Sequence, residues 1–183
     1  MSEVPGFENV ATGLNGIYRD VVRDAHGRVT WDSGWKNNAI TATCRNLLAG
    51  FMRGSPTGAL GIQGLAVGAG LPAWDTTSPP PATSAQTALV DPHPHHIPRT
   101  ALTISFLSGN VVSSTPTNRI QISASLGPGV PPWPDANHPT ISLREFGLVG
   151  QLDGATILIN YVTHPVITKD AASTLDRTLW LVF

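Results

Sequence analysis

The segment that decides the fold spans residues 120–126 and reads Ile-Gln-Ile-Ser-Ala-Ser-Leu. Apolar and polar side chains alternate along it, as in a strand with one face in the core and the other toward solvent. Residues 102–106 repeat this alternation, and residues 175–183 place Leu175 and Leu179 in one register. We therefore expect a β core over residues 99–183, with the last strand held in a sheet.

Residues 141–163 add further strands to this core. In 141–149 the apolar positions change phase partway, which predicts a β-bulge near Glu145. Residues 152–154, Leu-Asp-Gly, are typical of a hairpin turn. Residues 155–163 are apolar on both faces, which predicts one buried strand.

The N-terminal part predicts a hairpin over residues 17–35. Residues 17–23 and 28–32 are strand-like, and Asp-Ala-His-Gly between them favours a turn because glycine accepts a positive φ. Residues 60–67 predict another buried strand.

The helical pattern is confined to residues 38–52, where apolar residues recur on one face. Asn37 or Asn38 can cap its start, and Gly54 and Pro56 predict its end.

Two proline-rich arms interrupt the strands, at residues 71–98 and 127–139. Proline fixes φ and lacks a backbone donor, so neither arm can be a central strand or a long helix. Together these patterns predict a single domain over residues 1–183. It is a mainly β (α+β) fold, an antiparallel β-sandwich of about seven to eight strands with one amphipathic helix.

Composition excludes several classes of function. Charged residues make up 13% of the chain and the net charge is −1, so we predict no nucleic-acid partner. No apolar run approaches a membrane span and the N-terminus does not resemble a signal peptide, so we expect folding in the cytoplasm. Cys44 is the only cysteine, which excludes an intrachain disulfide; its place in the helical stripe predicts a core residue.

The strongest chemical candidate is a histidine cluster formed by His93, His95 and His96. Imidazoles bind transition metals, but a metal site needs three or four ligands and a second shell, and the other histidines lie far away in the sequence. We therefore predict an exposed polar patch with no metal and no cofactor. A ring of these histidines on the axis of a homotrimer is the alternative.

Enzymatic chemistry has little support in the sequence. There is no Gly-x-Ser-x-Gly elbow and no complete phosphate loop, so we predict no enzyme activity. Glu145 beside Arg144 is interpreted as a local ion pair or a bulge residue.

The proline-rich arms contain the candidate interface residues. Aromatic side chains are common interface anchors, but they can equally fold back onto their own sheet, and both alternatives stay open. The candidates are Trp74, Pro79, Pro80, Pro81, Trp133 and Pro134.

Three groups of segments, in order along the chain, resemble small structural proteins encoded in the tail, baseplate and fibre modules of tailed bacteriophages. The segments are 35–40 leading into 45–49; 65–70 with 74–75 and 87–89; and 144–149, 157–162, 167–170 and 174–183.

This resemblance implies a non-enzymatic virion protein that forms a symmetric oligomer in the tail, baseplate or fibre-attachment region. Its partners would be copies of itself and other virion proteins. A head decoration or neck protein is one alternative. A carbohydrate-binding module that stacks host glycans on Trp74 and Trp133 is another.

Overall fold

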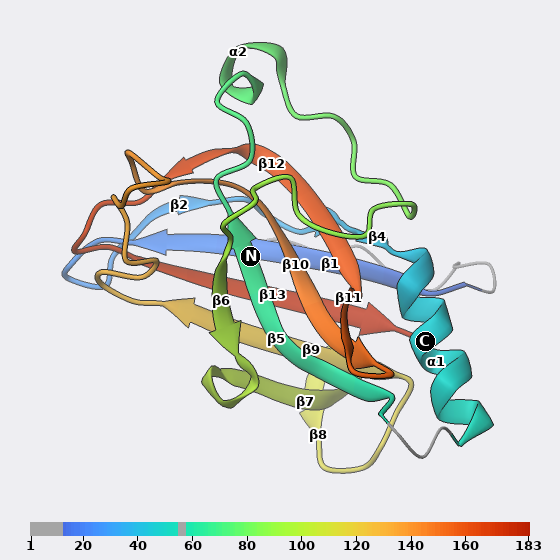
Figure 1. Ribbon diagram of the computed structural model, residues 1–183. Helices are drawn as coiled ribbons and strands as arrows, with labels where there is room; N and C mark the ends of the chain where they lie inside the picture. Colours follow the sequence, from blue (N-terminus) through green and yellow to red (C-terminus); the bar gives the residue numbers. More distant parts are fainter. Residues whose placement is uncertain (1–12, 55–57) are drawn as a thin grey trace.

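The computed structural model describes residues 13–54 and 58–183, which form an antiparallel β-sandwich of two sheets with one long helix at its end (Figure 1). The predicted fold class is confirmed.

One sheet has seven strands in the order β2-β1-β13-β9-β7-β8, and β3 also pairs with β1. The last strand, β13, lies between β1 and β9, so the prediction that it is held in a sheet is confirmed. The strands are β1 (Asn15–Arg23), β2 (Val29–Asp32), β3 (Lys36–Asn37), β7 (Leu102–Ser108), β8 (Val111–Ser113), β9 (Arg119–Leu126) and β13 (Thr174–Val182).

The other sheet has six strands in the order β4-β12-β10-β5-β6, and β11 also pairs with β10. Its strands are β4 (Ala39–Ile40), β5 (Leu60–Gly68), β6 (His95–Pro98), β10 (Ser142–Leu152), β11 (Ala155–Leu158) and β12 (Asn160–Thr168).

The described residues contain thirteen strands, more than the sequence predicts. Strands of two or three residues, such as β3, β4 and β8, are too short to show an alternating pattern. The single strand expected over residues 155–163 is instead two strands, β11 and β12, which separate at Ile159 and both pair with β10. Part of the first proline-rich arm forms the edge strand β6, since proline is tolerated at a sheet edge.

The long helix, α1 (Ala42–Arg53), starts later than predicted. Residues 36–37 and 39–40 pair with β1 and β12 instead of entering the helix. The N-cap is therefore Thr41, not Asn37 or Asn38. Gly54 ends the helix with φ of 70°, as predicted, whereas Pro56 lies outside the described residues. Two short helical turns complete the fold, α2 (Trp74–Thr77) and η1 (Arg99–Ala101).

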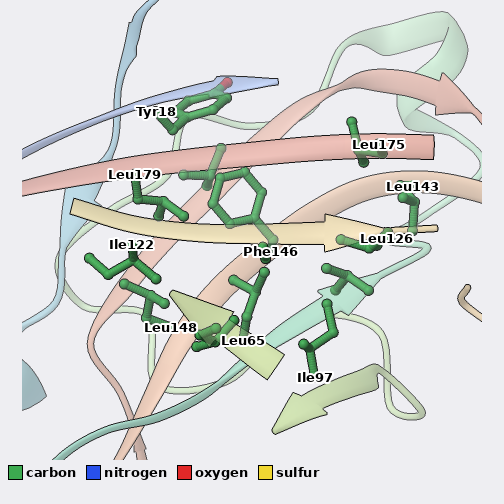
Figure 2. Packing of buried hydrophobic residues seen from close by; sticks show 14 of the residues in the cluster. Tyr18, Leu65, Ile97, Ile122, Leu126, Leu143, Phe146, Leu148, Leu175 and Leu179 are labelled. Atoms are coloured by element: carbon green, nitrogen blue, oxygen red, sulfur yellow. The ribbon is translucent and has the colours of Figure 1, made fainter. Parts of the chain in front are cut away.

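The core lies between the two sheets. Leu179 and Ile122 from one sheet meet Phe146 and Leu65 from the other, and all four are fully buried (Figure 2). Tyr18 packs its ring edge-on to Phe146, with centroids 5.2 Å apart. Burying each such side chain contributes roughly 1.5–3 kcal/mol, so this layer holds the sheets together.

Three local predictions are confirmed. The pairing of β10 with β12 shifts between Leu143 and Glu145, which is the expected bulge. Asp153 and Gly154 have φ of 50° and 83°, which suits a tight hairpin. Cys44 is buried, and its burial raises the pKa of the thiol to about 11.

Candidate functional site

Glu145 lies at the bulge of β10 and is completely buried. Its carboxylate accepts hydrogen bonds from the backbone N–H groups of Val90 at 3.0 Å and Asp91 at 2.7 Å. The Tyr161 hydroxyl on β12 donates to the same carboxylate. Burial, followed by this contact with Glu145, raises the pKa of Tyr161 above its usual range, so the hydroxyl remains a donor. With three donors the carboxylate is satisfied, and it holds the end of the first proline-rich arm on the sheet.

Arg144 holds the start of the same arm. Its guanidinium donates to both carboxylate oxygens of Asp75 in α2, at 2.7 and 2.6 Å, and to the backbone carbonyl of Ala69 at 2.8 Å. The hydrogen bond from Arg144 lowers the pKa of Asp75. An ion pair between Arg144 and Glu145, one of the two predictions for this position, is wrong because other donors occupy Glu145.

Asp91 and His138 join the two proline-rich arms. The Nε2 atom of His138 lies 3.0 Å from the Asp91 carboxylate, and its Nδ1 atom lies 2.9 Å from the Asp135 carboxylate. Asp91 also accepts from the backbone N–H groups of Ala69 and His93, both at 2.8 Å. We call Asp91, His138 and Asp135 the His138 latch.

The latch places a carboxylate oxygen at each nitrogen of the His138 ring. In either tautomer the ring donates a hydrogen bond to one of these two carboxylates. Burial opposes the charge on Asp135, but the N–H groups of Asn137 and His138, with the His138 ring, lower its pKa overall. The latch is thus a hydrogen-bonded link between residues of the two arms.

Neither tryptophan of the arms is available for docking. Trp74 is 7% exposed, and a Cβ atom on Gly70 would lie 2.5 Å from its ring. Trp133 is 6% exposed and stacks on the His138 ring with centroids 3.8 Å apart. The interpretation of Trp74 and Trp133 as interface anchors or glycan platforms is therefore wrong, because each indole packs against its own chain.

The prolines remain at the surface. Pro79 is half-buried, while Pro80, Pro81 and Pro134 are exposed. The Pro80 carbonyl accepts from the Thr163 hydroxyl at 2.8 Å. Figure 1 shows α2 and the chain after it outside the two sheets, and this chain returns to the sandwich at Ser84, whose carbonyl accepts from the Ala42 N–H at 2.8 Å. This part of the first arm presents a surface to solvent, whereas the second arm covers its own sandwich with Pro131 and Trp133.

The histidine cluster is not part of a metal site among the residues that the structure describes. His95 and His96 are consecutive residues of β6, so their side chains point to opposite faces of the strand. Across residues 13–54 and 58–183, no three His, Cys, Asp or Glu side chains are grouped to hold a metal ion. The trimer-axis alternative involves other copies and stays a prediction.

The sequence patterns did not predict a second buried polar group. Arg177 on β13 is fully buried and forms two bonds of 2.7 Å with the carboxylate of Asp20 on β1. Its guanidinium also lies over the Phe146 ring, 3.5 Å from the centroid, and contacts the ring of His164 at 3.3 Å. Arg177 shares the inward register of Leu175 and Leu179, and this was the signal that could have revealed it.

A cavity of about 390 Å³ opens at the end of the sandwich beside α1. Leu48 and Phe51 of α1, Ile62 of β5 and Ile120 of β9 line it. Phe51 is 47% exposed, so the cavity continues into an apolar rim. We call this space the end cavity.

The comparisons with known proteins give no family assignment: no family model matches the chain, and no curated protein or solved structure is similar to it at a significant level. In the described part of the chain, no helix combines the length and the apolar character that a membrane span requires.

Proposed function

We propose that this chain is a structural component of a tailed-phage virion and forms a symmetric oligomer in the tail, baseplate or fibre-attachment region. The proposal extends the resemblance of residues 35–183 to proteins of these modules. Its partners are copies of itself and other virion proteins, and it works without catalysis or a cofactor.

The observation that carries the proposal is the first proline-rich arm. It is fastened to the sandwich by Asp75 at one end and by Val90 and Asp91 at the other. The carbonyls of Pro80 and Ser84 also bond to the sandwich, but most residues between the two ends are exposed. Prolines restrict the free chain, so little conformational entropy is lost when such a segment binds a neighbour. A held and exposed arm of this kind suits a permanent subunit contact.

The buried polar groups support a structural role as well. Asp20, Asp91 and Glu145 each accept several hydrogen bonds from their own chain. Carboxylates occupied in this way hold loops and strands in place rather than face a substrate. The low share of charged residues, 13%, further favours extensive contact with neighbours, because few charges need desolvation.

A head decoration or neck protein is the second candidate, since the same exposed arm suits a capsid lattice. The carbohydrate-binding alternative loses its basis, because Trp74 and Trp133 are buried.

Immunogold electron microscopy of phage particles from the cells that encode this chain tests the proposal. Antibodies against the purified protein should label the tail, baseplate or fibre attachment. Label on the head or neck would favour the second candidate, and particles that lack the chain by mass spectrometry would overturn both.

A further inference from the structure

The end cavity has the composition of a ligand site. Small-molecule pockets of roughly 300–1,000 Å³ are mostly apolar with a few polar groups that orient the ligand. At about 390 Å³ the end cavity falls in this range, and only Gln63 and Arg99 bring polar side chains to its lining. The other side chains are hydrocarbon, aromatic or thiol.

Arg99 supplies the charge of this site. It begins the turn η1, directly after the edge strand β6. Within residues 13–54 and 58–183 its guanidinium has no hydrogen-bond or ion-pair partner, whereas Arg144 and Arg177 are both paired with carboxylates. No acidic side chain lines the cavity to neutralise it.

The geometry points to a monoanionic amphiphile as the occupant, namely a medium-chain carboxylate such as decanoate. Its hydrocarbon chain lies among Leu48, Phe51, Ile62 and Ile120, and its carboxylate is held by Arg99. A guanidinium matches the two oxygens of a carboxylate. A single guanidinium balances one negative charge, which favours a carboxylate over a phosphate dianion. This site is independent of the proposed virion role.

Isothermal titration calorimetry tests the charge contact. Decanoate should bind the wild-type protein, and decanol should bind at least tenfold more weakly because it lacks the charge. Arg99→Gln should reduce the affinity for decanoate to that for decanol. Arg53→Gln removes an exposed charge at the end of α1, outside the cavity lining, and should leave the affinity unchanged.

The apolar part of the site has its own test. Octanoate should bind roughly 15-fold more weakly than decanoate, because each buried methylene contributes about 0.8 kcal/mol. Leu48→Trp places a larger ring in the cavity from the half-buried face of α1 and should abolish binding. Circular dichroism confirms that each variant is folded.

Cys44 gives a second readout of occupancy, since it is the only cysteine and lines the cavity, and its buried thiol alkylates slowly. Decanoate should slow alkylation of its thiol, followed by mass spectrometry, in the wild-type protein but not in Arg99→Gln at the same concentration. Equal decanoate affinity in the wild-type and Arg99→Gln proteins, or unprotected Cys44 at saturating decanoate, would overturn the inference.

Discussion

His138 is the residue through which the two proline-rich arms contact each other. Replacing it with alanine removes a hydrogen-bond partner from the buried Asp91 carboxylate, and such a loss at a buried polar group typically costs about 1–3 kcal/mol. We expect His138→Ala to lower the free energy of unfolding toward the smaller of these values, because Asp91 keeps two backbone donors. Urea denaturation measures the change.

His26 provides the matched control. It lies exposed in the turn between β1 and β2, so His26→Ala should change stability by less than about 0.5 kcal/mol. Similar urea midpoints for the two variants would show that the His138 latch contributes nothing.

His164 makes stability depend on pH. Burial, followed by the charge of Arg177, lowers its pKa to about 4, although Asp20 and the Pro165 carbonyl act in the opposite direction and Lys36 adds to the decrease. The unfolded chain takes up a proton at this histidine near its ordinary pKa of about 6.5, and the folded chain only near 4. The unfolded state therefore binds more protons between these values, and stability falls as pH falls through this window.

The variant His164→Gln removes this contribution. We expect the decline in unfolding free energy from about pH 6.5 to about pH 4.5 to be clearly smaller in the variant than in the wild-type protein. Urea denaturation at several pH values tests this, and parallel profiles would refute it.

At the level of elements, the start of α1 depends on Thr41. Its hydroxyl accepts from the Cys44 N–H at 3.3 Å and reaches the Ile159 carbonyl at 3.1 Å, so it caps the helix and ties it to the six-stranded sheet. Thr41→Ala should cost about 1–2 kcal/mol of unfolding free energy. Asn37→Ala, at a position that the sequence also offered as a cap, should cost less than about 0.5 kcal/mol in the same urea titration.

The elements also show why strand prediction succeeded only in part. β9 and β13 are long enough for alternation to reveal the buried face, whereas β3 and β4 are two-residue strands defined by their partners β1 and β12. These short strands form because a neighbouring strand offers backbone hydrogen bonds, and no local sequence pattern predicts them.

For the molecule as a whole, the proposed oligomer predicts that charges on the first arm interfere with assembly. Pro80→Asp with Pro81→Asp places two carboxylates on its exposed surface. We expect the double variant to keep its urea midpoint but to dissociate at concentrations at least about tenfold higher than the wild-type protein, since unpaired charges in an interface are costly. Sedimentation velocity measures this.

Pro116→Asp is the control, because Pro116 is exposed in the loop between β8 and β9, away from the first arm. It should leave the association unchanged. Unaltered association in the double variant would show that the first arm is not part of the subunit interface.

The sequence by itself determined the β-sandwich, the amphipathic helix, the bulge at Glu145 and the inward face of the last strand. These features depend on the periodicity of neighbouring residues, which each segment carries locally. Only the tertiary structure decided which polar groups meet. Asp91 and His138 lie 47 residues apart, and Asp20 and Arg177 lie 157 apart. Their contacts follow from how the arms fold back onto the sandwich and from the order of the strands in the sheet. A local sequence pattern contains neither kind of information. For the same reason the side chains of Trp74 and Trp133 face inward, which neither their type nor their spacing reveals.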